Sequence, residues 1–174
     1  MIRLVASVEI EAPVGRVWSV LCDVEKWPEW TSTVTSVRCL DNGPFSIGSR
    51  AEIRQPRLRP AVWKVTKLRD RNNFTWITRN PGVRITAGHQ LEPNGTGTRV
   101  TLSLEFTGPL GSLVGRLYRN LSQRYVQTEA DALRARAKAW PSVDFTPTVQ
   151  QEFCPASGRL HHNLLTRERA IWAH

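Results

Sequence analysis

One histidine stands where a polar side chain is not expected. Residues 83–92 alternate between apolar and polar types, which is typical of a β-strand with one buried face. His89 falls on the apolar side, so its imidazole should point inward and must find a partner or stay neutral. Such a group could donate a hydrogen bond or a proton to a carbonyl or phenol of a ligand. A core histidine bonded to protein or water is the alternative.

Large aromatic rings accompany this histidine, because the chain contains seven tryptophans. Rings of this size need a large apolar interior, a cavity or a binding surface to receive them. Trp63 and Trp76 lie in strand-like segments and could stack on a flat ligand, although core packing explains them equally well. Trp27 and Trp30 flank Pro28 and could form an aromatic rim, or could pin short helices to a sheet.

An apolar helical stripe later in the chain could supply the opposite wall of a site. Apolar residues recur at steps of three and four from Leu110 to Leu133, which predicts one helix of more than twenty residues. Tyr125 lies on this stripe, where its hydroxyl could assist His89 in proton transfer. Catalytic candidates are therefore His89 and Tyr125, and ligand-binding candidates are Trp27, Trp30, Trp63, Trp76, Ile85, Ala87, His89, Leu117, Leu121 and Tyr125.

The elements that must position these residues follow one another in a clear order. Residues 2–11 read as a strand, and two short helices follow between Pro13 and Trp30. About six strand segments come next, separated by turns rich in Gly, Pro, Asn and Asp. A long helix follows, and its Gly111-x-x-x-Gly115 spacing should let the helix start approach the sheet.

This order predicts an α+β fold in which a curved antiparallel sheet wraps around a long C-terminal helix. A strongly twisted sheet of this size curls, and one long helix can lie in its concave face. One helix does not fill the whole trough, so we expect a cavity between sheet and helix. We assign residues 1–139 to this domain and residues 140–174 to an irregular C-terminal extension.

No sequence motif calls for a cofactor or a metal ion. Nucleotide-binding glycine loops and the HExxH zinc motif are absent from the sequence. Cys154, His161, His162 and His174 could be grouped as metal ligands, but they lie in the irregular extension, and metal ligands need a rigid framework. We therefore expect no metal and no cofactor.

The net charge and the N-terminal sequence further limit the functions that we expect. The formal net charge is +9, but the basic residues are scattered, which does not favour nucleic acid as a partner. The N-terminus alternates instead of forming a signal peptide, and no run of about 20 apolar residues could span a bilayer. We expect a cytoplasmic protein without a transmembrane segment, and the sequence leaves open whether two copies form a homodimer.

Several short motifs resemble one known superfamily. Residues 8–18, VEIEAPVGRVW, resemble the opening I-x-A-P-x-x-x-V-W of the SRPBCC superfamily, also called START-like or polyketide cyclase/dehydrase-like. Residues 23–30, DVEKWPEW, are similar to its D-x-x-x-W-P-x-W segment, and residues 91–101 and 108–110 also fit. The resemblance covers about residues 1–139 and implies the helix-grip fold with a hydrophobic cavity. Members include lipid and hormone carriers, aromatic polyketide cyclases, coenzyme Q-binding proteins and ribosome-associated proteins.

Three functions remain open on these grounds. The first is binding of a small hydrophobic or aromatic ligand, lipid- or polyketide-like, in the cavity. The second is a polyketide cyclase/dehydratase-type enzyme, a lyase or isomerase, that uses His89 as acid/base; the sequence shows no obvious partner carboxylate inside. The third is protein or RNA binding through a basic surface, which requires that Arg54, Arg57, Arg59, Arg69, Arg71 and Arg79 gather into one patch.

Overall fold

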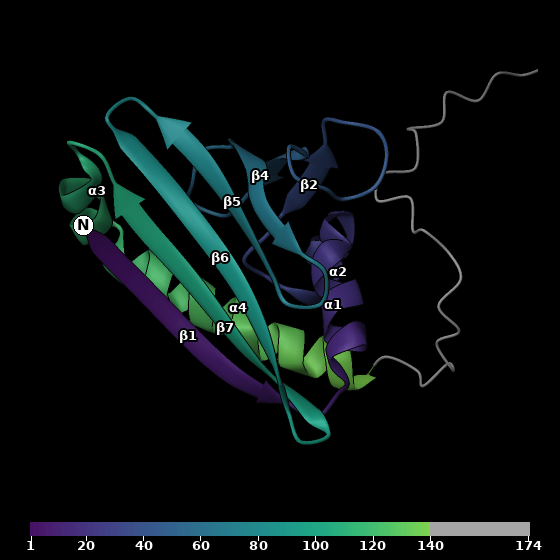
Figure 1. The fold of residues 1–174 in the computed structure, drawn as a ribbon. Helices are drawn as coiled ribbons and strands as arrows, with labels where there is room; N and C mark the ends of the chain where they lie inside the picture. The colour runs from purple at the N-terminus through teal and green to yellow at the C-terminus, as the bar shows by residue number, and fades with distance from the viewer. Residues whose placement is uncertain (140–174) are drawn as a thin grey trace, which may run out of the picture.

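A computed structural model of the chain describes residues 1–139, so the predicted extension at 140–174 lies outside the described residues. The strands are β1 (Ile2–Ile10), β2 (Ser36–Cys39), β3 (Arg50–Arg54), β4 (Ala61–Arg69), β5 (Asn73–Asn80), β6 (Val83–Asn94) and β7 (Gly97–Thr107). The helices are α1 (Val14–Cys22), η1 (Val24–Lys26, a 3-10 helix), α2 (Trp27–Trp30), α3 (Gly111–Leu117) and α4 (Arg119–Ala139). This is the predicted α+β helix-grip architecture (Figure 1).

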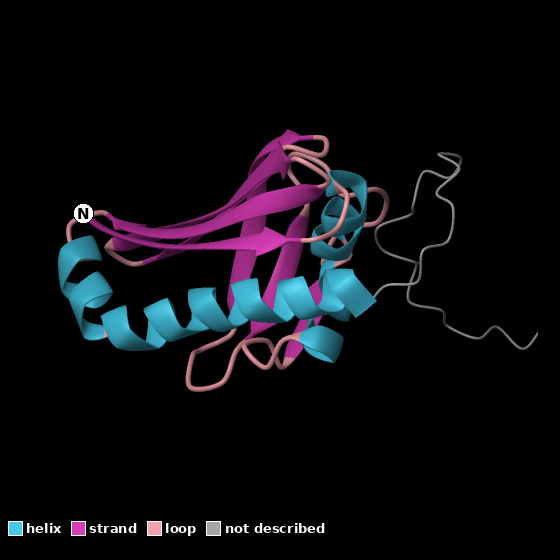
Figure 2. Ribbon diagram, turned by 90° about the horizontal axis from the view of Figure 1, so that it is seen from below, coloured by secondary structure: helices cyan, strands magenta, loops and turns pink. Residues whose placement is uncertain are grey.

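All seven strands belong to one sheet, in the order β1-β7-β6-β5-β4-β3-β2. Every neighbouring pair is antiparallel, and the register between β4 and β5 shifts between Val65 and Lys67. Such a shift bends a strand and increases its twist. The sheet therefore curves, and α4 lies along its concave face (Figure 2).

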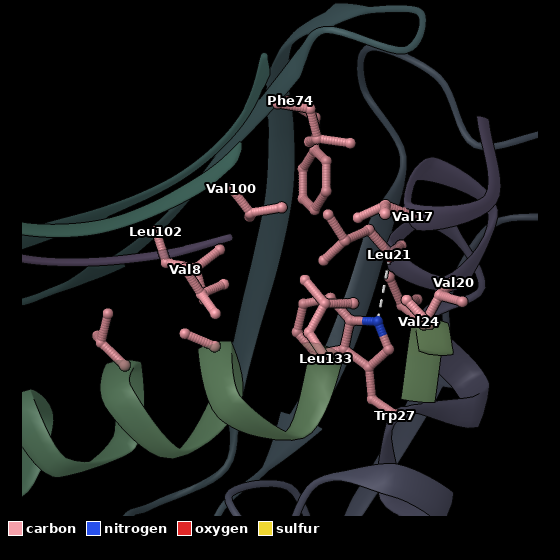
Figure 3. Packing of buried hydrophobic residues seen from close by; sticks show 14 of the residues in the cluster. Val8, Val17, Val20, Leu21, Val24, Trp27, Phe74, Val100, Leu102 and Leu133 are labelled. Atoms are coloured by element: carbon pink, nitrogen blue, oxygen red, sulfur yellow. Dashed lines mark hydrogen bonds between the residues drawn. The ribbon is translucent and has the colours of Figure 1, made fainter. Parts of the chain in front are cut away.

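The core fills the space between the curved sheet, α1 and α4. Val8, Val100 and Leu102 point from the sheet toward α4, where Leu133 is completely buried (Figure 3). The buried residues of α4 recur at steps of three and four, as the amphipathic pattern predicts: Ser122, Val126, Ala130, Leu133 and Ala137. Trp27 joins this core, and its indole Nε1 donates a hydrogen bond to the carbonyl oxygen of Leu21 at 3.1 Å. The buried N–H is thereby satisfied.

The predicted long C-terminal helix is present as α4, which has 21 residues, but the apolar stripe from Leu110 to Leu133 does not lie on one helix. The helix is interrupted at Tyr118 (φ −96°, ψ 5°), where α3 ends and α4 begins. Gly111 and Gly115 let α3 press against the end of the sheet, as predicted: an added Cβ at Gly115 would lie 2.8 Å from Cβ of Ile2. A straight helix would not follow both the sheet end and its concave face. The apolar residues of α3 are therefore not directed into the trough.

Among the described residues, no helix has the length and apolar character that crossing a membrane requires.

Candidate functional site

A small cavity of about 80 Å³ lies between the concave face of the sheet and α4. Its apolar and aromatic walls are Trp27, Val34, Ile53, Leu58, Trp76, Ala87, Leu104 and Val126. Its polar groups are Gln55, His89, Ser122, Tyr125 and Glu129. An apolar cavity with a few convergent polar groups is the usual form of a small-molecule site, although such sites commonly measure about 300 Å³ or more.

His89 is held in the cavity wall by aromatic rings. The side chain is only 4% exposed. Its imidazole stacks on Phe74 with ring centroids 4.1 Å apart and an interplanar angle of 11°, because the two residues are register partners on β5 and β6. The rings of Trp27 and Trp76 each lie 5.8 Å away. The imidazole therefore has a fixed orientation, and its Nδ1 atom has no hydrogen-bond partner among the described residues.

Glu129 of α4 lies beside this histidine. Its Oε1 atom is 3.4 Å from Nε2 of His89, and its side chain is 14% exposed. This distance is long for a hydrogen bond, and the pair becomes an ion pair only when the imidazole is protonated. A carboxylate beside an imidazole can orient the ring and stabilise the imidazolium during proton transfer. The arrangement therefore has the parts of an acid–base pair.

Sequence reasoning missed Glu129, and no inward carboxylate was expected. A signal was available, because Glu129 lies three residues after Val126 and four before Leu133, on the same side of α4. Glu129 is a charged residue on the apolar face of a helix, just as His89 is a polar residue on the apolar face of a strand.

Tyr125 connects α4 to the loop between β3 and β4, residues 55–60. Its hydroxyl donates a hydrogen bond to the carbonyl oxygen of Pro56. Gln55 and Leu58 of the same loop line the cavity. Arg57 between them has a left-handed backbone (φ 62°), which is unfavourable for a residue with a side chain. The loop thus forms part of the cavity wall, and a hydrogen bond from Tyr125, which was predicted to face the ligand, holds it to α4.

The structure brings half of the ten predicted ligand-binding residues to the cavity: Trp27, Trp76, Ala87, His89 and Tyr125. The other five, Trp30, Trp63, Ile85, Leu117 and Leu121, do not line it. Trp30 packs on Trp27 and Trp63 packs on Trp76, with ring centroids 5.9 and 5.6 Å apart, so each contacts a tryptophan that lines the cavity.

Leu117 was predicted on the wrong side of the helix. Its side chain is 75% exposed, because it belongs to α3, which follows the sheet end. Leu121 is half-buried at the start of α4, just beyond the interruption at Tyr118. Ile85 packs at the α3 end of the sheet, near Leu4 and Phe106. The interruption of the helix thus accounts for two of the five differences.

The arginines that a basic binding patch would require are spread over both ends of β4. Arg57 and Arg59 precede this strand, whereas Arg69 and Arg71 lie at its far end. A nine-residue strand separates the two pairs, which corresponds to about 30 Å. Arg54 and Arg71 also contact carboxylates, those of Glu52 and Asp70. Arg54 and Arg79 lie beside the start of β4, near Arg57 and Arg59, so the six arginines fall into two groups and do not form one patch.

The fold and its motifs match one family. A family model described as "Polyketide cyclase / dehydrase and lipid transport" matches residues 1–138. The chain belongs to this family. No curated protein matches the sequence. Membership confirms the predicted superfamily and supports a fold that binds hydrophobic ligands.

Solved structures from several bacteria share the fold of this family member. The protein TTHA0849 from Thermus thermophilus is 23% identical, with a TM-score of 0.64, and the match covers 79% of this chain and 98% of that chain. Zhui aromatase/cyclase from a Streptomyces species is 15% identical, with a TM-score of 0.63 over 79% and 93% of the two chains. A START superfamily protein from Mycobacterium smegmatis is 18% identical, with a TM-score of 0.59 over 78% and 97%. At these identities the likeness concerns the fold alone.

Proposed function

We propose that this family member binds a small aromatic or apolar molecule that carries one polar group, in the cavity between the sheet and α4. The observation that carries the proposal is the buried His89, whose Nδ1 atom has no partner among the described residues. Glu129 lies beside it, and the rest of the cavity wall is mainly apolar and includes two tryptophans. A buried polar atom without a partner costs about 1–3 kcal/mol. Nδ1 has almost no accessible surface, so a ligand hydroxyl would supply the missing hydrogen bond after a small movement of the side chains around the imidazole.

The cavity is partly open to solvent and suits a ligand portion about the size of one ring. Its volume is about 80 Å³, and a larger lipid- or polyketide-like molecule requires that the loop at residues 55–60 move outward. The unfavourable backbone conformation of Arg57 favours such a movement, whereas the hydrogen bond from Tyr125 to Pro56 opposes it. Displacing Leu58 would extend the cavity toward solvent.

The test compares two ligands of the same size, phenol and toluene, by quenching of tryptophan fluorescence. Phenol should bind the wild type about tenfold more tightly than toluene, since its hydroxyl gains one buried hydrogen bond worth about 1–1.5 kcal/mol. The His89→Phe variant should bind phenol no more tightly than toluene, because the phenol hydroxyl is then buried without a partner. Equal binding by the wild type would contradict the proposed polar contact, and no binding of either ligand would contradict the cavity as a binding site. Mass spectrometry of molecules extracted from the purified protein would identify the natural ligand class.

A second candidate function is a cyclase or dehydratase, and the distance between Glu129 and His89 favours it. In an aldol-type cyclisation, the imidazole removes a proton from a carbon next to a carbonyl, and that carbon attacks a second carbonyl of the same substrate. The imidazolium then returns the proton to the new alkoxide, so the proton balance closes. Glu129 would stabilise the imidazolium between the two steps. Tyr125 could assist only after its hydroxyl leaves Pro56.

Glu129→Gln separates the two functions. If the protein is an enzyme, this variant should retain phenol binding but slow the cyclisation of a poly-β-ketone thioester by at least tenfold, because a neutral amide stabilises an imidazolium poorly. If the wild type cyclises the thioester no faster than the uncatalysed reaction, ligand binding remains the proposed function. If Glu129→Gln cyclises the thioester as fast as the wild type, Glu129 has no role in the reaction.

A further inference from the structure

The outward face of α3 and the residue before it carry a group of exposed leucines, of which only Leu110 is partly covered, by Gly82. Leu110, Leu113 and Leu117 are 47%, 66% and 75% exposed, and they follow one another at steps of three and four, so they share one face of the helix. Tyr118 at the interruption is 38% exposed. We call these four residues the α3 patch. It lies at one end of the molecule, beside the N-terminus and away from α1 and α2 (Figures 1 and 2).

Unpaired positive charge surrounds the α3 patch. Residues 108–124 contain Arg116, Arg119 and Arg124 and no acidic residue. These three arginines are exposed, and none forms an ion pair within the described part of the chain. The segment therefore combines an apolar face with purely basic neighbours.

The strand ends beside the turn between β5 and β6 carry two more arginines at this end of the molecule, on the face of the sheet opposite α3. The backbone N–H of Leu110 donates a hydrogen bond to the carbonyl oxygen of Gly82 at 2.9 Å, which places this turn against α3. Arg79 and Arg84 are direct register partners across the hairpin, and both are exposed. Like charges in this position repel each other, and Glu105 on β7 stays outside ion-pair distance of both. These two arginines add to the positive charge of this end of the molecule.

We propose that the α3 patch docks on an anionic lipid bilayer. Exposed leucines with a tyrosine at their border and arginines on the flanks are the composition of a helix that lies in a membrane interface. Leucine is under-represented among the residues that dominate protein–protein binding energy, which disfavours a protein as the occupant. The leucines enter the boundary between headgroups and acyl chains, while the arginines contact lipid phosphates. Docking through the α3 patch does not depend on the ligand proposed for the cavity.

The test uses the full chain and flotation with two kinds of vesicles, pure phosphatidylcholine and phosphatidylcholine mixed with phosphatidylglycerol. The wild type should float with the anionic vesicles and much less with the neutral ones. Added salt should weaken the binding, because it screens the arginines. Failure of the wild type to bind the anionic vesicles would overturn the proposal. A second copy, a protein partner or another part of the chain would then be the occupant of the α3 patch.

Paired variants locate the binding surface. Leu113→Ser with Leu117→Ser should reduce binding to anionic vesicles at least tenfold, whereas Ile47→Ser, which changes another exposed apolar residue (64% exposed), should leave it unchanged. Arg116→Gln with Arg119→Gln should lower binding and its salt dependence, whereas Arg69→Gln should have little effect. Unchanged binding by the double leucine variant, or an equal loss with Ile47→Ser, would overturn the assignment. All of these substitutions change exposed side chains, so melting temperatures close to that of the wild type should accompany them.

Discussion

At the scale of single residues, His89 combines a packing role with a polar one. Its ring stacks on Phe74 at 4.1 Å, as an aromatic core residue would, while its nitrogens face Glu129 at one edge and no described partner at the other. Stacking fixes the ring, so a ligand meets an imidazole that is already oriented. Orientation before binding reduces the entropy that binding must overcome.

The two roles can be separated by two substitutions. His89→Phe keeps a ring on Phe74 and removes the unpartnered nitrogen, so the free energy of unfolding in urea should stay within about 1 kcal/mol of the wild type. His89→Ala leaves a void under Phe74 and should lower this free energy by about 2–4 kcal/mol. Equal losses for the two variants would mean that the nitrogens, not the stacked ring, stabilise the fold.

Gly115 allows α3 to lie against the sheet. An added Cβ would lie 2.8 Å from Cβ of Ile2 and 3.2 Å from Cβ of Phe106. Gly115→Ala should therefore lower the free energy of unfolding by about 1–3 kcal/mol, as overpacking does. Gly15→Ala is the matched control, because its position in α1 has nothing within 4 Å. That control should stabilise the protein by about 0.5–1 kcal/mol.

At the scale of elements, α4 forms one wall of the cavity and also holds the neighbouring loop in place. Val126, Ala130 and Leu133 face the core, while Tyr125 holds the loop at residues 55–60. The loop supplies Gln55 and Leu58 to the cavity, so exchange of a ligand with solvent depends on how firmly α4 holds it. One hydrogen bond contributes about 0.5–1.5 kcal/mol to such a contact.

Tyr125→Phe removes this hydrogen bond and keeps the ring. Both association and dissociation of phenol should become about 2- to 10-fold faster in stopped-flow fluorescence, because the loop opens more readily. The dissociation constant should change less than either rate, since the walls of the cavity stay the same. A large change in affinity with unchanged rates would indicate that the tyrosine hydroxyl contacts the ligand directly.

At the scale of the whole molecule, carboxylates at the end of β1 tie distant segments together. Glu9 accepts hydrogen bonds from Asn94 Nδ2 at 2.9 Å and from Arg99 Nε at 2.6 Å, which joins β1 to the turn between β6 and β7. Glu11 accepts one from Lys138 Nζ at 2.8 Å, which joins the start of the chain to the end of α4. The bonds from Asn94 and Arg99 lower the pKa of Glu9, and the bond from Lys138 lowers the pKa of Glu11.

These lowered pKa values predict a dependence of stability on pH. Both carboxylates are easier to ionise in the folded state, so their contribution is present above the ordinary pKa of 4.5 and is lost as the pH falls through the folded pKa. The double variant Glu9→Gln/Glu11→Gln should melt at a lower temperature than the wild type at neutral pH. The two melting temperatures should converge in acid, and a constant difference across this range would contradict the pKa shifts.

The sequence alone was enough to determine the order of the elements and the face of each strand. Alternation at period two placed His89 and Ala87 on the inner side of β6, and the structure agrees. The spacing of Gly111 and Gly115 likewise indicated a close approach to the sheet, and the structure shows it. These features depend on residues that are close in the sequence, and their faces follow from backbone geometry.

Tertiary structure alone decided which residues meet at the cavity. The interruption at Tyr118 turned Leu117 outward, and the curvature of the sheet brought Glu129 to His89 and Pro56 to Tyr125. A periodic pattern gives the face on which a side chain lies, but it does not give the position along that face at which two distant elements cross. That position depends on how the sheet bends and where the helix stops, so the acid–base pair and the fastened loop became visible only in the folded chain.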